Sequence, residues 1–259
     1  MLLFILIAVS VFAFVTYRSN RFQEMIASEG WTSALNKSER FSLQKHFAYY
    51  RYLPPRSQKI FEYRVNRFRN LTKFVPREMD QVTSEMEILI SASAVQLTFG
   101  YDDVFLAHFE RIIIYPDHFF SRSDQRYHKG EVNPAMGVIV LSWKHFVEGY
   151  AADEGLNLGL HEMAHALQLE NIIMNDEFDF MSSDDIQIWH ELANAEMTKI
   201  HNQEVAFFRE YASTNHAEFF AVAVENFFER PKEFFEHNKP LYKTLCSLLK
   251  QDPLLLKRR

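Results

Sequence analysis

Cysteine is nearly absent from this chain of 259 residues, in which Cys246 is the only one. A single thiol excludes a disulfide framework and any cysteine-based metal cluster within one chain, and it fits a reducing cytosol or a secreted protein equally well. Glycine and proline are also scarce, with seven and eight residues, whereas all-β proteins need many turns. We therefore expect helix to dominate the fold.

Positive charge is in deficit as well. The 34 acidic and 28 basic residues give a net charge of −6, so we expect no nucleic acid among the partners. Hydrophobic residues make up 47% of the chain, which excludes disorder and suffices for one large domain or two small ones. The 25 phenylalanines are not interleaved with basic residues and are expected to form core. Serine-hydrolase, Walker-type and dinucleotide-binding motifs are missing.

The sequence has one long apolar run, at residues 2–17, and it carries no charge. Sixteen residues of helix reach about 24 Å, and snorkelling of Arg18 and Arg21 would cover the rest of a bilayer core. The basic residues follow the run, unlike those of a signal peptide, so the positive-inside rule places the rest of the chain in the cytoplasm. We expect a single-pass anchor at residues 1–20 in the inner (cytoplasmic) membrane. A signal peptide and a buried helix are the alternatives.

We expect residues 21–259 to form one helix-rich α+β domain, with a helical part at about 36–100 and a catalytic part at about 101–255. Two β-branched runs bounded by breakers predict strands at 111–115 and 137–143. The acidic stretch at 176–185 is expected to be a loop. Helical periodicity predicts helices over the segments 38–50, 59–68, 84–99, 217–228, 232–237 and 241–250.

Residues 161–165 read HEMAH, which is the HExxH pattern. In a helix His161 and His165 share a face, with Cβ atoms about 5–6 Å apart, so that both imidazoles can bind one Zn²⁺ ion. Glu162 then lies beside the metal's water and can take its proton. An ordinary amphipathic helix with two exposed histidines would show the same five residues, so a third ligand has to decide between the two interpretations.

The third ligand is not the histidine of the metzincins, because Gln168 and Asn171 stand where that motif has its glycine and histidine. A glutamate on a second helix is the other common solution. The apolar segment 217–225 carries Glu218 and Glu225 seven residues apart, and hence on one face. Zn²⁺ bound by Glu218, with Glu225 orienting a ligand imidazole, would compensate these carboxylates if they are buried. The alternative is that both face solvent.

Several separate segments, in order, resemble the Mlc titration factor A (MtfA) family, zinc-dependent peptidases of the gluzincin type. The resemblance covers roughly residues 36–255 and implies a zincin-like metallopeptidase domain with a small sheet beside the HExxH helix. The segments that carry it are IIIYP at 112–116, GVIVLSW at 137–143, NLGLHEMAH at 157–165, AEFFAVAVENFFERP at 217–231, LY at 241–242 and QDPL at 251–254.

The resemblance also implies roles for five residues. His161, His165 and Glu218 would bind Zn²⁺, and Glu162 would be the general base. Tyr211 stands seven residues before Glu218, where the family has a tyrosine near the metal, and its phenol could donate a hydrogen bond to the developing oxyanion. Simple packing of Tyr211 is the alternative.

The chain departs from the family after the second histidine. The family usually has an aspartate-containing run there, whereas this chain has Ala166, Leu167 and Gln168, which puts a loop contact in doubt rather than the metal ligation. The other histidines are not expected to form a site. His190 and His201 are eleven residues apart, and His145, His216 and His237 are isolated in the sequence.

We therefore predict a zinc-dependent peptidase that acts on a peptide or protein substrate. The alternative is a membrane-tethered protein that binds and sequesters a transcriptional regulator, with little or no proteolysis, as the family's name implies for one member. Zinc-dependent hydrolysis of a non-peptide amide is a third interpretation, since the same water and base would serve.

Overall fold

The computed structural model describes residues 35–121, 125–151, 154–204 and 207–256, and the structural statements below refer to these residues. Residues 37–259 form the larger of two units into which the chain divides. The anchor expected at residues 1–20 lies outside the described residues. Among the described helices, none is both long enough and apolar enough to cross a bilayer.

The larger unit begins with helices that surround a buried one. Every residue of α5 from Ile88 to Thr98 is buried, because α5 packs against α2, α4 and the later helix α7. Thr83 caps α5 by accepting a hydrogen bond from the Met86 amide. Pro55 occupies the first turn of α4, where its missing amide costs nothing. The bounds are α2 (Lys37–His46), α3 (Ala48–Tyr52), α4 (Pro55–Leu71) and α5 (Ser84–Thr98).

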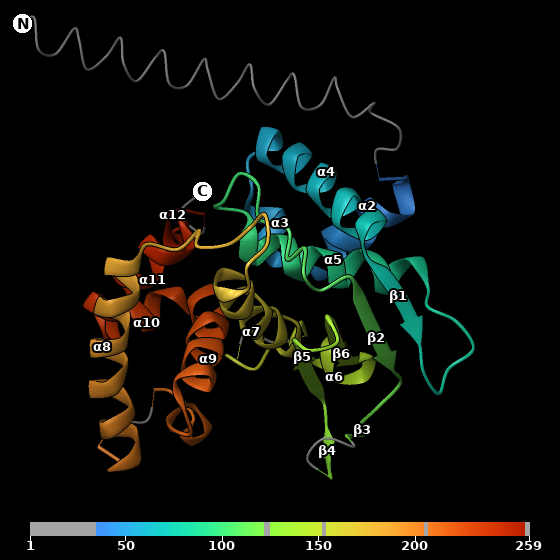
Figure 1. Ribbon diagram of the computed structural model, residues 1–259. Helices are drawn as coiled ribbons and strands as arrows, with labels where there is room; N and C mark the ends of the chain where they lie inside the picture. Colours follow the sequence, from blue (N-terminus) through green and yellow to red (C-terminus); the bar gives the residue numbers. More distant parts are fainter. Residues whose placement is uncertain (1–34, 122–124, 152–153, 205–206, 257–259) are drawn as a thin grey trace, which may run out of the picture. The chain divides into compact units, whose positions relative to one another are not determined.

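A four-stranded sheet follows, in the order β1-β2-β6-β5 (Figure 1). Strands β1 (Lys73–Pro76), β2 (Arg111–Tyr115) and β6 (Val138–Ser142) are parallel, and β5 (Gly130–Asn133) is the antiparallel edge strand. The two strands expected from the sequence are therefore confirmed as β2 and β6. Strands β1 and β5 were not expected, because four residues that include a proline or a glycine and a charge give no strand signal.

A second, two-stranded sheet consists of β3 (Phe119–Ser121) and β4 (Arg126–His128). Helix α6 (Trp143–Gly149) starts directly after β6, because the Ser142 hydroxyl accepts a hydrogen bond from the His145 amide.

Helix α7 (Leu158–Ile172) packs against β5 and β6 and also against α5 and α9 (Figure 1).

Asp184 and Asp185 form the first turn of α8, so the expected loop at 176–185 is wrong in its last three residues. Acidic side chains favour a helix N-terminus, which explains why a charged run begins this helix. The remaining elements are α8 (Ser183–His201), the 3₁₀ helix η1 (Glu210–Ser213), α9 (His216–Glu229), α10 (Pro231–His237), α11 (Lys239–Leu249) and α12 (Pro253–Leu256).

The fold is thus helix-rich α+β with a small sheet, as the sequence predicts. The expectation that phenylalanines form core is confirmed for part of them. Phe41, Phe120 and Phe178 are exposed, whereas the largest fully buried side chains include Phe47, Phe61, Phe219, Phe227 and Phe234.

Candidate metal centre

Helix α7 places two histidines on one face. Asn157 caps the helix by accepting a hydrogen bond from the Leu160 amide at 3.0 Å. His161 and His165 lie one turn apart on this helix, and their Nε2 atoms are 3.2 Å apart. Both side chains are largely buried, with 11% and 16% of their surface exposed. The interpretation of the HExxH residues as two solvent-exposed histidines therefore does not hold.

The first turn of α9 brings Glu218 to the same point. Asn215 caps this helix, because its Oδ1 accepts a hydrogen bond from the Glu218 backbone amide at 3.0 Å. The Glu218 Oε2 atom lies 3.1 Å from Nε2 of His161 and 3.6 Å from Nε2 of His165. The three ligand atoms therefore converge, all within 4.8 Å of one another.

The donor set matches a tetrahedral divalent metal. Ligand atoms at about 2.0–2.1 Å from a tetrahedral ion lie about 3.3 Å from each other. The three donor separations are 3.1, 3.2 and 3.6 Å, so one ion fits between them with little rearrangement. Two imidazoles and one carboxylate leave the fourth position of such an ion open, as in catalytic rather than structural zinc sites.

Glu225, two turns along α9 from Glu218, contacts the other side of His161. Its Oε1 accepts a hydrogen bond from Nδ1 of His161 at 2.7 Å, and its side chain is 1% exposed. This contact holds the imidazole with Nε2 directed at the metal position. The alternative in which both carboxylates face solvent is excluded for Glu225 by its burial.

Arg209 compensates the buried charge of Glu225, a contact that the sequence analysis missed. Its guanidinium donates to Oε1 at 2.6 Å and to Oε2 at 3.1 Å, and it also donates to the Gly155 carbonyl at 2.7 Å. The Asn157 amide donates to Oε2 at 2.6 Å. A buried carboxylate on an apolar helix needs a cationic partner. In the sequence, this need is the only signal that could have prompted a search for Arg209.

These contacts shift the proton affinities of two of the three donors. Burial lowers the pKa of His161, but hydrogen bonds to Glu218 and Glu225 outweigh it and raise the pKa to about 10. Burial raises the pKa of Glu218, yet the two imidazoles hold it well below its usual range. Without a metal, His161 therefore carries a proton that a metal ion has to displace.

Glu162 lies next to the metal position, against the edge strand. It is 5% exposed, and burial raises the pKa of its carboxyl. A Cβ atom at Gly130 of β5 would stand 2.2 Å from its Oε1, so only glycine allows the carboxylate to occupy this place. A buried glutamate with a raised pKa is suited to accept and return a proton.

Tyr211 belongs to η1, and its ring lies 6.3 Å from that of His161. Half of its surface is exposed. Burial of the rest and the negative charge of Glu218 raise the pKa of its phenol to about 12. The hydroxyl therefore keeps its proton at neutral pH and can donate a hydrogen bond.

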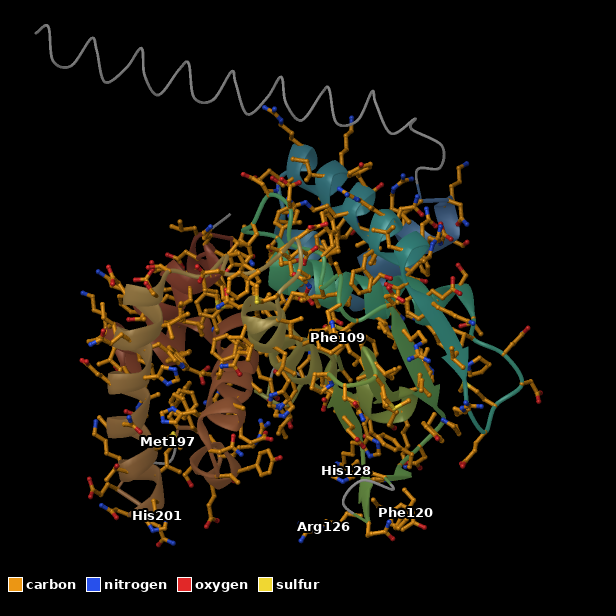
Figure 2. The ribbon with its side chains drawn as sticks, in the orientation of Figure 1. Phe109, Phe120, Arg126, His128, Met197 and His201 are labelled. Carbon is orange, nitrogen blue, oxygen red and sulfur yellow. The ribbon has the colours of Figure 1, made fainter. Side chains whose placement is uncertain are left out.

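Two cavities border this cluster, of about 560 and 650 Å³. Both are lined by His161, Glu162 and Tyr211, and both reach His128 of β4 and Gly130 of the edge strand β5. Figure 2 shows His128 at the sheet side of the space between the sheet and the C-terminal helices. The two cavities share these lining residues and are called the cleft below.

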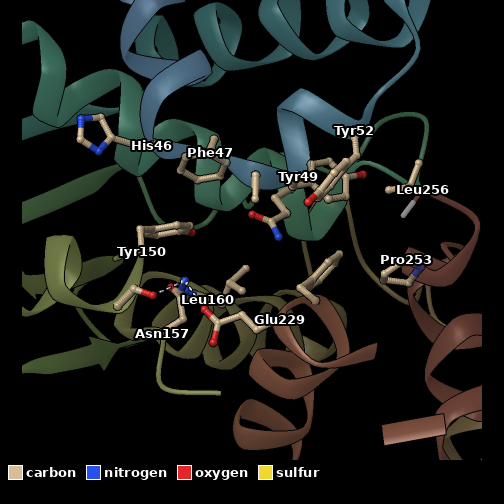
Figure 3. A pocket seen from close by; sticks show the side chains of 14 residues that line it. His46, Phe47, Tyr49, Tyr52, Tyr150, Asn157, Leu160, Glu229, Pro253 and Leu256 are labelled. Carbon is tan, nitrogen blue, oxygen red and sulfur yellow. Dashed lines mark hydrogen bonds between the residues drawn. The ribbon is translucent and has the colours of Figure 1, made fainter. Parts of the chain in front are cut away.

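A smaller cavity, of about 50 Å³, is lined by Asn157 and Glu229 (Figure 3). Asn157 also lines one of the two larger cavities; its backbone amide donates to Glu225, and its side-chain amide donates to Glu229 at 2.9 Å. Glu229 also accepts a hydrogen bond from the Gly155 amide at 2.7 Å. The loop before α7 is therefore fixed to α9 by two buried glutamates.

The histidines predicted to be isolated are not isolated. Nδ1 of His216 lies 3.4 Å from Nδ1 of His190, which is itself on the cleft wall. His237 contacts Glu196, and His145 lies beside Asp117 and His118. His201, at the far end of α8, lines neither cavity (Figure 2). The prediction failed because each partner comes from a different element.

The chain matches the family described as glucose-regulated metallo-peptidase M90 over residues 19–250. It belongs to this family. A Synechocystis protein named "Uncharacterized protein slr2042" is 25% identical over 223 residues, which is 80% of this chain and 81% of that protein.

Two similar proteins carry the name Mlc titration factor A, which confirms the resemblance found in the sequence. Those of Salmonella agona and Salmonella arizonae are each 29% identical over 158 residues, or 59% of this M90 chain. The matched part is 54% and 57% of their own length, so the chain spans little more than half of these relatives. Membership in a metallopeptidase family implies a metal cofactor, for which the cluster of His161, His165 and Glu218 is a candidate site.

Proposed function

We propose that this chain is a zinc-dependent peptidase whose metal is held by His161, His165 and Glu218. The observation that carries the proposal is the convergence of these three donors, 3.1–3.6 Å apart, beside the buried carboxylate of Glu162. Zinc, when bound, would polarise the scissile carbonyl and acidify a water molecule. Nitrogen and carboxylate donors in this number suit zinc better than calcium or magnesium, which prefer oxygen donors only.

Protein groups then move the protons. Glu162 accepts the proton of the attacking water and returns it to the leaving amine, for which its raised pKa is suited. Tyr211 donates a hydrogen bond to the carbonyl oxygen as negative charge develops there. Glu225 and Arg209 act through His161. Glu225 accepts a hydrogen bond from its imidazole, and Arg209 pairs with Glu225.

Strand β5 is proposed to align the substrate. Strand β5 pairs with β6 along one edge and ends the four-stranded sheet. Its residues Gly130, Glu131 and Val132 line the cleft. An extended peptide can add to such an edge through main-chain hydrogen bonds, which gives binding with little dependence on sequence. The scissile bond would then pass Glu162 where Gly130 lets the carboxylate approach.

The substitution Glu162→Gln tests the proposal, because it removes the base and preserves the shape of the side chain. We expect unchanged zinc content and loss of peptide hydrolysis by at least about 100-fold. Glu191→Gln, an exposed position on α8, is the matched control and should keep full activity. Loss of zinc from folded Glu162→Gln, or retained hydrolysis, would refute the assignment.

A binding function is the second proposal. Relatives that this chain matches over 54–57% of their length are named Mlc titration factor A. We propose that a transcriptional regulator is a partner of the same chain. Pull-down of a candidate regulator by Glu162→Gln separates the two functions, since binding should survive where hydrolysis is lost.

We also propose that residues 2–17 anchor the chain in the inner membrane with the metal centre in the cytoplasm. A reporter fused to the C-terminus tests this orientation. Signal from outside the cytoplasm would reverse it.

A further inference from the structure

A second group of metal-ligating side chains lies outside the centre described above. Oδ1 of Asp117 is 2.8 Å from Nδ1 of His118 and 3.7 Å from Nδ1 of His145. One ligand atom from each of the three residues lies within 4.8 Å of the other two, the same convergence as in the first cluster. The two imidazole rings are 4.3 Å apart.

The topology explains why these residues meet. Strands β2 and β6 are parallel neighbours, and their last residues, Tyr115 and Ser142, are register partners. Asp117 and His118 follow the end of β2, and His145 follows the end of β6. The carboxyl ends of adjacent parallel strands are the usual place for ligand sites in such sheets.

The His145 ring is preorganised. Its side chain is 10% exposed, and Ser142 Oγ, 2.8 Å from its Nδ1, holds the ring in place; an ion bound at Nδ1 would replace this contact with the hydroxyl. On the other side, Nε2 of His145 lies 3.8 Å from Oε2 of Glu148, a second carboxylate within reach. His118 and Asp117 are more exposed and can adjust to an ion.

From this convergence we infer a second divalent-metal site, formed by Asp117, His118 and His145. Two nitrogen donors and one carboxylate select a zinc-like transition metal over magnesium or calcium. Oδ2 of Asp117 accepts a hydrogen bond from Lys144 at 2.9 Å, and Oδ1 accepts one from the His118 backbone amide at 2.8 Å, so Oδ1 would bind the ion through its second lone pair. The site does not depend on the peptidase function proposed above.

Charge makes this site weaker than the first. The ammonium of Lys144 lies on the same carboxylate, and Lys129 also acts on His145, so two cations oppose the bound ion. Asp117 and Glu148 are the carboxylates that favour it. His145 and Glu148 line the same cavity as His161 and Glu162, so the second ion would stand on the wall of the substrate cleft.

Metal stoichiometry tests the inference. The full chain, kept in detergent because of its apolar segment, is dialysed against excess Zn²⁺ and its bound zinc is measured. We expect two ions per chain in the parent protein and one in His118→Ala, whose exposed side chain can be removed without loss of the fold. His165→Ala should also bind one, and the double variant none. His201→Ala, remote from both clusters, is the matched control and should bind two.

Lys144→Met gives an independent test in the opposite direction. Removal of one like charge beside the ion should tighten the weaker site by about tenfold and leave the stronger one unchanged. The inference is overturned if the parent protein binds a single ion, if His118→Ala still binds two, or if Lys144→Met leaves the weaker affinity unaltered.

Discussion

The buried carboxylate of Glu225 accepts a hydrogen bond from Nδ1 of His161 at 2.7 Å, so a residue outside the donor set fixes the orientation of the donor. Arg209 in turn pairs with both oxygens of Glu225. Arg209 thus supports Glu225, and Glu225 supports His161; three of the predictions below concern these residues.

Glu225→Gln should lower zinc affinity by about 10–100-fold, because a neutral amide orients the imidazole less well and no longer strengthens its basicity. Competition with a chromophoric chelator measures this affinity. Glu191→Gln on the surface of α8 should match the parent protein. Equal affinities in Glu225→Gln and the parent would show that Glu225 does not act through His161.

Arg209→Met should destabilise the metal-free chain by about 2–4 kcal/mol, since it removes the guanidinium that pairs with both oxygens of the buried Glu225 carboxylate and leaves the protonated His161 as its remaining cationic partner. Urea unfolding measures the change. Arg126→Met, at an exposed position of β4, should stay within about 0.5 kcal/mol of the parent protein. A comparable loss in both variants would contradict a specific role for the Arg209–Glu225 pair.

Gly130→Ala should abolish most hydrolysis while zinc remains bound, because the new methyl group would overlap the Glu162 carboxylate and displace it. The metal donors lie on α7 and α9 rather than on β5, so they should not move. Zinc analysis beside a peptide-cleavage assay separates the two effects. Full activity in Gly130→Ala would place the base elsewhere.

Zinc binding should depend on pH through His161. Its pKa in the metal-free fold is about 10, so the proton is present at neutral pH and competes with the metal. Raising the pH removes that competitor, and the affinity should rise by roughly tenfold per unit from about pH 7 to pH 10. In weakly buffered solution about one proton per chain should be released at this site when zinc is added. Binding at pH 8 without proton release would contradict the His161 assignment.

Tyr211→Phe should reduce kcat by about 10–100-fold with little change in KM or zinc content, because it removes only a donor to the developing charge. The pKa of Tyr211 is about 12, so its proton is retained throughout the neutral range. The parent protein should therefore show no loss of activity from this group below about pH 11. A rise in KM or a loss of bound zinc together with the fall in kcat would point to packing instead.

Much of the fold could be predicted from local patterns. The β-branched runs predicted β2 and β6, and helical periodicity predicted α4, α5 and α9 to α11 to within a few residues, although α4 extends further than expected. Strands β1 and β5 depend on pairing with β2 and β6 rather than on their own composition, so no local pattern could have found them.

In the candidate site, too, local spacing predicts some residues and only the fold brings in the others. The spacing of His161 and His165 follows from one helix, and that of Glu218 and Glu225 from another. Arg209 lies outside both helices, and Gly130 matters because the sheet edge passes α7. The grouping of His145 with Asp117 and His118 likewise results from strand order, which spacing in the sequence does not encode.

The central claim, that His161, His165 and Glu218 hold one zinc ion, is tested most directly by the zinc content of Glu218→Ala. The measurement is made in the His118→Ala background, so that the second inferred site does not contribute. The account predicts about one zinc per chain in His118→Ala and very little once Glu218→Ala is added. Equal zinc content in the two proteins, or none in folded His118→Ala offered excess metal, would contradict it.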